Sequence, residues 1–177
     1  MKKSYAFAPI ALAALFSLSA MAVQKDITVT ADIDPTVELL QSDGTALPSS
    51  IKMTYLPGVG LQKQTLSTKI FTNDATKQVE MRLLATPSLT SITTPTAAAI
   101  PLTVSYNGKA LTTAVTKDST LEPAVLFPNG RLDGGSVPFD LVIAQSTPGL
   151  VTTSGSYQGV VSLVLNTSTV PVTPPAP

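Results

Sequence analysis

The chain has 177 residues, enough for one domain with a substantial core, and charged residues make up only 12% of it. Histidine and cysteine are both absent, which excludes Ser-His-Asp and Cys-His catalysis, the usual zinc sites and disulfides. The 11 basic and 11 acidic residues balance, so no nucleic-acid partner is expected. Stability must therefore come from packing, strand pairing and assembly. So low a content of charged residues favours a surface that neighbouring molecules cover.

Residues 1–22 have the pattern of a secretory signal peptide. Two lysines follow Met1, an apolar run is centred on Ala11–Leu18, and Ala20-Met21-Ala22 matches the small-x-small cleavage pattern. The apolar run is shorter than the ~20 residues that span a bilayer, which argues against a membrane anchor. Val23 is thus predicted as the first mature residue, and the mature chain would carry a net charge of −2.

The segment Val23–Asp34 alternates with a period of two residues. One parity is apolar and holds Ile27, Val29, Ala31 and Ile33, whereas the other holds Asp26, Thr28, Thr30, Asp32 and Asp34. Successive side chains of a strand point to opposite faces, so this pattern predicts a strand with one apolar face, which Pro35 ends. The pattern alone leaves two interpretations open: the first strand of a complete sandwich, or a strand that packs into another copy of the protein.

Shorter alternating or apolar stretches follow, separated by turn residues. They predict strands over Val37–Leu40, Ile51–Tyr55, Thr65–Phe71, Gln78–Leu83, Ile100–Tyr106, Leu111–Val115, Phe139–Ile143 and Tyr157–Leu165. Asn107-Gly108 is the favoured pair for a two-residue hairpin turn. Residues 87–95, rich in serine, threonine and proline, predict an irregular connection. Tyr157–Leu165 is apolar on both faces, which predicts a central strand.

No stretch of ten or more residues in the mature chain shows a helical stripe. Many short strands between turn signals predict an all-β fold, an antiparallel β-sandwich in one domain.

Four stretches in this order connect the chain to a known family. They are Ile27-Thr-Val-Thr-Ala31 leading to Asp34-Pro35, Leu39-Leu-Gln-x-Asp-Gly-x-Ala-Leu-Pro-Ser49, Thr72-Asn-Asp-Ala-Thr-Lys77 and Gly155-x-Tyr-x-Gly-Val-Val-Ser-Leu-Val164. On these residues the chain resembles the major subunits of class 5 fimbriae. This is the alternate chaperone–usher group, which contains the enterotoxigenic colonisation-factor pilins and the cable-type pilin.

The resemblance implies an incomplete immunoglobulin-like sandwich that lacks one strand and is completed by donor-strand exchange. It implies a division into a signal peptide (1–22), an N-terminal donor-strand extension (23–35), a pilin domain (36–166) and a Pro-rich tail (167–177). The buried donor-strand anchors would be Val23, Ile27, Val29, Ala31 and Ile33, and Asp34 with Pro35 would form the hinge after the donor strand.

The function implied is that of a major structural subunit of an adhesive fimbria that polymerises head-to-tail. Its partners would be identical subunits, a periplasmic chaperone, an outer-membrane usher and a tip adhesin, with a host-cell receptor left open. It would pass through the periplasm to the cell surface. The alternatives are a minor or tip adhesin and a self-contained secreted carbohydrate-binding sandwich.

Other candidate sites are weaker. Asp32 and Asp34 would lie about 6.5–7 Å apart along a strand, a spacing that also suits an inverting glycosidase, but a solvated strand face explains them better. Asp43-Gly44 and Asp133-Gly134 lack the ligand series of a calcium loop. Asn166-Thr-Ser168 matches the glycosylation pattern, which is frequent by chance in a threonine-rich chain. The sequence therefore predicts no enzyme, no cofactor and no metal site.

Overall fold

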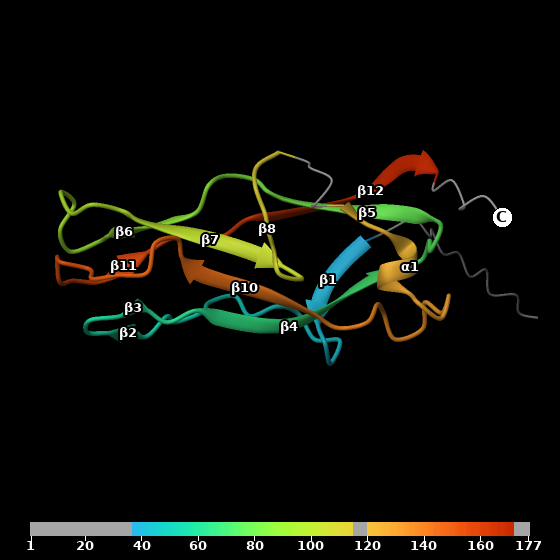
Figure 1. Ribbon diagram of the computed structural model, residues 1–177, viewed down its shortest axis with the longest axis horizontal. Coiled ribbons are helices and arrows are strands. Elements are labelled where there is room, and N and C mark those ends of the chain that lie inside the picture. Colours follow the sequence, from blue (N-terminus) through green and yellow to red (C-terminus); the bar gives the residue numbers. More distant parts are fainter. Residues whose placement is uncertain (1–36, 115–119, 172–177) are drawn as a thin grey trace, which may run out of the picture. The chain divides into compact units, whose positions relative to one another are not determined.

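The computed structural model describes residues 37–114 and 120–171, and strands make up nearly all of their regular structure (Figure 1). The predicted all-β, antiparallel fold is confirmed. The larger sheet has the order β1-β4-β10-β7-β6-β11, and β8 pairs with β7. Its strands are β1 (Val37–Gln41), β4 (Gln64–Thr72), β10 (Phe139–Gln145), β7 (Ile100–Tyr106), β6 (Ser88–Ser91), β11 (Tyr157–Gln158) and β8 (Lys109–Ala110).

A smaller sheet of three strands has the order β12-β5-β9. These strands are β12 (Leu163–Pro171), β5 (Lys77–Leu83) and β9 (Thr120–Leu121). Two short strands, β2 (Tyr55–Leu56) and β3 (Gly60–Leu61), form a separate hairpin. The one helix of the described residues, α1 (Pro123–Leu126), begins with proline at a position where its missing N–H costs nothing. No described helix is long and apolar enough to cross a membrane.

The core lies between the two sheets and follows the predicted alternation. In β7 the side chains of Ile100, Leu102, Val104 and Tyr106 are buried, and in β5 those of Val79, Met81 and Leu83 are buried. Most of these residues join Leu141 and Ile143 of β10 in one cluster. Because alternate residues of a strand share a face, one apolar parity from each sheet is enough to build this core.

The hairpin turn between β7 and β8 is as predicted. Asn107 and Gly108 have φ angles of 50° and 75°, as the tight turn of a two-residue hairpin requires. The returning strand, however, ends at Ala110, so the predicted strand over 111–114 is wrong; Val115 lies outside the described residues. The side chain of Leu111 enters the core and the carbonyl of Thr112 accepts a hydrogen bond from the N–H of Leu83, so the chain crosses to the smaller sheet.

The segment predicted as a single central strand, Tyr157–Leu165, is divided between the two sheets, so that prediction is wrong. β11 pairs with β6 at the end of the larger sheet, and β12 pairs with β5 in the smaller one. Between them Gly159 lies against the carbonyl of Ser88, where a Cβ atom would collide with it. β12 also continues to Pro171, beyond the predicted domain end at 166.

Two other predictions need correction. The segment 87–95, predicted to be irregular, contains β6, whose Leu89 pairs with Ile100 of β7. Serine and threonine can occupy this short strand because β7 and β11 pair with it on its two sides. In the predicted strand Ile51–Tyr55 only Tyr55 forms part of a ladder, with Leu61.

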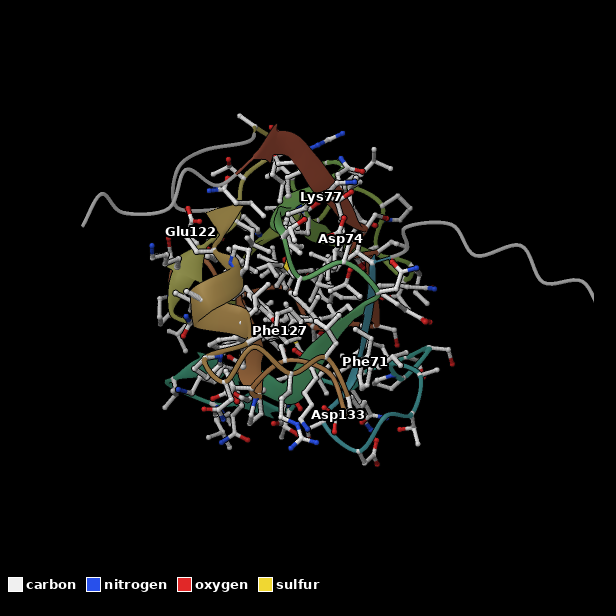
Figure 2. All side chains as sticks on the ribbon, turned by 90° about the vertical axis from the view of Figure 1, so that its right-hand side faces the viewer. Phe71, Asp74, Lys77, Glu122, Phe127 and Asp133 are labelled. Atoms are coloured by element: carbon white, nitrogen blue, oxygen red, sulfur yellow. The ribbon has the colours of Figure 1, made fainter. Side chains whose placement is uncertain are left out.

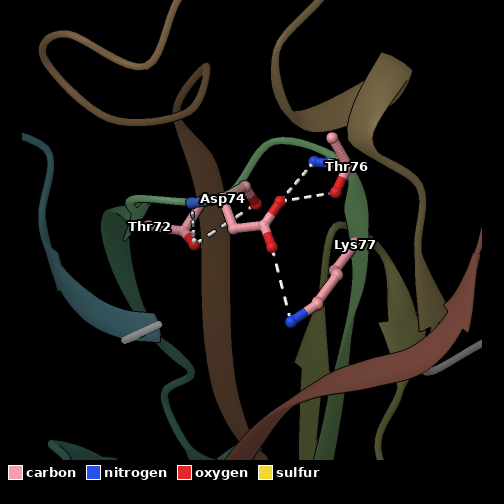
Figure 3. A network of polar contacts seen from close by, with 4 residues as sticks. All are labelled: Thr72, Asp74, Thr76 and Lys77. Atoms are coloured by element: carbon pink, nitrogen blue, oxygen red, sulfur yellow. Dashed lines mark hydrogen bonds and ion pairs between the residues drawn. The ribbon is translucent and has the colours of Figure 1, made fainter. Parts of the chain in front are cut away.

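A polar turn joins β4 of the larger sheet to β5 of the smaller one (Figure 3). The N–H and hydroxyl of Thr76 donate to the Asp74 carboxylate at 2.9 and 2.6 Å, and the Lys77 ammonium lies 3.4 Å from it. The hydroxyl of Thr72 accepts from the N–H of Asp74 at 3.2 Å. The hydrogen bonds to the carboxylate, first that of the Thr76 hydroxyl, lower the pKa of Asp74. Figure 2 views the end of the domain where this turn lies.

Candidate functional site

A mostly apolar groove with a volume of about 970 Å³ opens among the described residues. Its floor comes from the core face of the larger sheet, with Leu66 of β4, Ile143 of β10, Leu102 of β7 and Leu89 of β6. One wall is the segment 47–53 with Tyr55, and the other is the segment 151–161 with Leu163. The groove thus opens the core of the sandwich itself.

The first wall carries backbone groups that have no partner among the described residues. Within residues 37–114 and 120–171, no backbone hydrogen bond is made by Ile51, Lys52 or Met53, whereas the neighbouring Thr54 accepts one from Gln62. Met53 nevertheless packs against the core. The predicted alternation buries Met53 more than its neighbours, but the described chain supplies no strand that pairs with Ile51–Met53.

The second wall has a similar edge. Leu163, Val164 and Leu165 pair with Leu83, Arg82 and Met81 of β5. On their other side the described residues provide no partner strand, because β12 is the outermost strand of its sheet. Leu163 and Leu165 are half-buried against the core. Unpaired N–H and C=O groups beside an apolar surface cost free energy unless another chain satisfies them.

Hydrogen bonds hold segments that line the groove or lie next to it. The side chain of Gln145 accepts from the N–H of Leu61 at 2.9 Å and donates to the carbonyl of Gly149 at 3.4 Å, which ties β3 to the loop after β10. The hydroxyl of Tyr157 donates to the carbonyl of Thr153 at 2.9 Å.

The chemistry of the groove suits a peptide strand. Lys52 is the single charged residue among those that line it. No three Asp, Glu, His or Cys side chains of the described chain gather as metal ligands. An apolar trough between two unpaired edges is the arrangement that accepts an added strand, which pairs through its backbone and fills the trough with alternate side chains.

The site residues predicted from the sequence belong to the N-terminal segment. Val23, Ile27, Val29, Ala31, Ile33, Asp34 and Pro35 are all outside the described residues, so their roles stay predictions. None of the residues that line the groove was predicted from the sequence as a site residue. Two signals pointed to them: the alternation of Ile51, Met53 and Tyr55, and the apolar character of both faces around Val160–Leu163.

The sandwich has two antiparallel sheets, and its core opens into a groove beside strand edges that have no partner among the described residues. This arrangement defines the class of incomplete immunoglobulin-like subunits. The model of one family, the CS1 type fimbrial major subunit, matches residues 23–166. The chain belongs to this family.

Individual relatives agree with the family. The chain is 42% identical over 175 residues to a CS1 fimbrial subunit of Escherichia coli, covering 96% of this chain and 100% of that protein. It is 41% identical over 170 residues to a CFA/I fimbrial subunit of an enterotoxigenic E. coli strain, covering 93% and 98%. Among solved structures, the CooA pilin of enterotoxigenic E. coli matches with a TM-score of 0.64 and 37% identity, covering 76% of this chain and 89% of that one.

These findings give the chain its general role. It is a structural subunit of a fimbria, a family that is not a class of enzymes, and it polymerises with identical subunits in fimbriae at the cell surface. The prediction of an incomplete immunoglobulin-like fold agrees with the pilin match.

Proposed function

We propose that this subunit polymerises by donor-strand exchange, in which the groove of one copy receives residues 23–34 of the next. The observation that carries the proposal is the apolar groove, which Ile51–Met53 and, at Leu163, the strand β12 help to line. Neither has a partner strand on its free side among the described residues. A strand laid between these edges gains backbone partners on both sides. It also covers apolar side chains that would otherwise face water.

The sequence of the extension fits such a groove. Ile27, Val29, Ala31 and Ile33 share one face and would repeat every 6.6–6.8 Å or so along the strand. Burial of each large aliphatic side chain contributes about 1.5–3 kcal/mol. Val23 would be a further anchor, and Asp34 with Pro35 would end the inserted strand because proline cannot continue its ladder.

In donor-strand exchange, every copy offers a strand from one surface and a groove on another. A contact between two different surfaces is head-to-tail and does not close, so its repetition yields a filament. Since a single inserted strand gains little net free energy, the durability of the filament would rest on slow dissociation.

The route to the surface is part of the same proposal. The signal peptide would send the chain to the periplasm, where an unfilled groove is an aggregation hazard. A periplasmic chaperone would fill it until an outer-membrane usher exchanges it for the next copy. A tip adhesin would carry the main recognition of host cells, and the shaft itself would catalyse no reaction.

Electron microscopy of the purified mature chain, residues 23–177, tests the proposal. Filaments are expected from the wild-type chain, and none from a chain that lacks residues 23–34 or carries Ile33→Asp, since either change removes a buried anchor. Thr30→Asp is the matched control, because it places the same charge on the opposite face of the strand and should leave filaments intact.

Two results would contradict the proposal. If the Ile33→Asp chain forms filaments as well as the wild type does, donor-strand exchange through this segment is wrong. If the wild-type chain stays a monomer whose own residues 27–33 fill its groove, the protein is a complete sandwich, and a self-contained binding module becomes the better interpretation.

A further inference from the structure

The hairpin of β2 and β3 presents apolar side chains to water, together with the loop after β10. A Cβ atom at Gly60 of the hairpin would collide with the carbonyl oxygen of Gly149, so the hairpin and this loop are in contact. Large apolar side chains gather here in exposed positions, and we call them the hairpin patch: Tyr55, Leu56, Val59 and Leu150. Grouped apolar side chains on a surface mark a site of interaction.

The conformation of the hairpin is well defined. The N–H of Val59 donates to the carbonyl of Leu56 at 3.1 Å, and Gly58 has a φ angle of 82°, which fits a type II turn after Pro57. The N–H of Leu61 donates to the side chain of Gln145 at 2.9 Å and so ties β3 to the end of β10. An isolated copy therefore keeps Val59 facing water at 59% exposure, a cost in free energy that contact with another surface would remove.

The hairpin and the first described residue lie at opposite ends of β4. β4 begins at Gln64, shortly after β3, and ends at Thr72, which pairs with Val37. The eight steps between Gln64 and Thr72 correspond to about 26 Å of strand. Figure 1 shows the hairpin at the left of β4 and α1 at the right. We call the end at Thr72 and Val37 the chain-entry end.

The chain-entry end exposes apolar side chains as well. Val125 of α1 is 48% exposed and Val137 is 36% exposed. The N–H of Val137 donates to the carbonyl of Leu126 at 2.9 Å, so the two valines lie on neighbouring segments. The N–H of Ser136 donates to the carbonyl of Ile70 at 2.8 Å, which holds these segments beside the last residues of β4. Figure 2 faces this end of the domain.

We propose that the hairpin patch of one copy docks against the chain-entry end of the next copy in the filament. The inference rests on the proposed function. Only Pro35 and Thr36 separate the donor strand from β1. The three steps from Asp34 to Val37 span at most about 11 Å of chain. A copy that inserts its strand is therefore drawn against the copy that receives it.

The need to repeat the contact selects the end of the receiving copy. The chain-entry end of each copy sends out its own extension, so it already faces the preceding copy. The following copy then has to lie at the other end of β4, where Tyr55 and Leu61 of the hairpin line the groove. Every step of the filament thus joins two different surfaces, as a head-to-tail polymer requires.

Reactivity of a single cysteine tests the contact, because the chain contains none of its own. The mature chain with Val59→Cys is labelled with a maleimide as filaments. The same chain with Ile33→Asp added is labelled as a monomer, with and without a peptide of residues 23–35. Labelling should be about tenfold slower in filaments than in either monomer state, because thiol reactivity depends on access. Equal labelling in filaments and monomers would overturn the proposal, and so would protection by the peptide alone.

Thr103→Cys is the matched control for labelling. Thr103 is exposed and lies midway along β7, at neither end of the domain. Filament formation should slow its labelling much less than that of Val59→Cys. Equal protection of both cysteines would mean that side-by-side packing covers the whole surface, which contradicts a contact confined to the ends.

Charged substitutions at the two ends provide a second test. Val59→Asp and Val125→Asp should each slow polymerisation about tenfold, because an unpaired charge in an apolar contact is costly. Both side chains are exposed in the monomer, so its thermal unfolding should change little. The affinity of the groove for the peptide of residues 23–35 should also stay the same. Thr103→Asp is the control and should polymerise at the wild-type rate.

The two proposals fail in different ways. If Ile33→Asp abolishes filaments while Val59→Asp polymerises at the wild-type rate, the extension fills the groove but the hairpin patch makes no contact. If Val59→Asp is slow and Val125→Asp is not, the hairpin patch meets some other surface and the docking proposed here is wrong. If Ile33→Asp itself leaves filaments intact, donor-strand exchange is wrong and the docking inference falls with it.

Discussion

Tyr106 is a polar residue in an apolar place. Its side chain is 2% exposed, its ring lies 5.8 Å from that of Phe139, and its hydroxyl has no hydrogen-bond partner in the described chain. Tyr106→Phe should therefore raise the free energy of unfolding by about 1 kcal/mol, because it removes a buried hydroxyl that is desolvated without compensation. Urea denaturation measures the change. A decrease of similar size would mean that the hydroxyl is satisfied by a group outside the described residues.

The same hydroxyl predicts a dependence on alkaline pH. Burial raises the pKa of Tyr106 to about 12 from its ordinary value of 10.0. Between these two values the folded chain keeps a proton that the unfolded chain has lost, so stability falls as pH rises from 10 to 12. The wild-type chain should lose stability faster than Tyr106→Phe over this range. Parallel losses in both chains would contradict the assignment.

Asp74 predicts a dependence on acid pH. Hydrogen bonds from Thr76 lower its pKa below 3.8, so its contribution to stability is present above pH 3.8 and is lost as pH falls through the lowered pKa. Asp74→Asn should lower the midpoint of thermal unfolding at pH 7, and the difference from the wild type should shrink below pH 3.8. Asp140→Asn is the control, because that exposed carboxylate has no bonding partner among the described side chains. A difference that is constant with pH would refute the role of the charge.

At the scale of the elements, the crossing between β11 and β12 depends on one glycine. A Cβ atom at Gly159 would collide with the Ser88 carbonyl and lie 3.1 Å from a methyl carbon of Leu89. Gly159→Ala should cost about 1–3 kcal/mol of stability, since β6 or the crossing must shift. Gly149→Ala is the matched control, with no atom within 4 Å of the new methyl group, and equal effects of the two changes would contradict the argument.

The strands that bury one face could be predicted from the sequence. β5 and β7 alternate between buried and more exposed residues, and the turn at Asn107-Gly108 requires positive φ angles that few other residue pairs adopt. Periodicity does not say to which sheet a strand belongs. For this reason the change of sheet at Gly159, and the turn toward β5 after Ala110, were both missed.

The groove could not be predicted from the local pattern for a related reason. Ile51 and Met53 have the pattern of an ordinary strand, and only the three-dimensional arrangement shows that the described chain leaves this strand without a ladder. The sequence did show the alternating segment 27–33, the strand that is proposed to enter the groove. This segment indicated an added strand only through the family resemblance, because a complete sandwich often begins with an alternating strand of the same kind.

At the scale of the whole molecule, the unfilled groove predicts stabilisation by a free peptide. A monomer held back from polymerisation by Ile33→Asp should bind a synthetic peptide of residues 23–35. Its free energy of unfolding should rise by about 2.7 kcal/mol at a peptide concentration of about 100 times Kd. Calorimetry of thermal unfolding measures the shift. The same peptide with Ile33→Asp should produce little shift, and equal shifts with both peptides would show that the groove does not recognise the anchors.

The unpaired edges of the groove have a consequence for the extremities of a filament. Under donor-strand exchange, the terminal copy at one extremity has no successor to supply its missing strand, whereas the copy at the other keeps an unused extension. Growth is therefore directional. The vacant extremity would stay exposed to water unless another chain closed its groove.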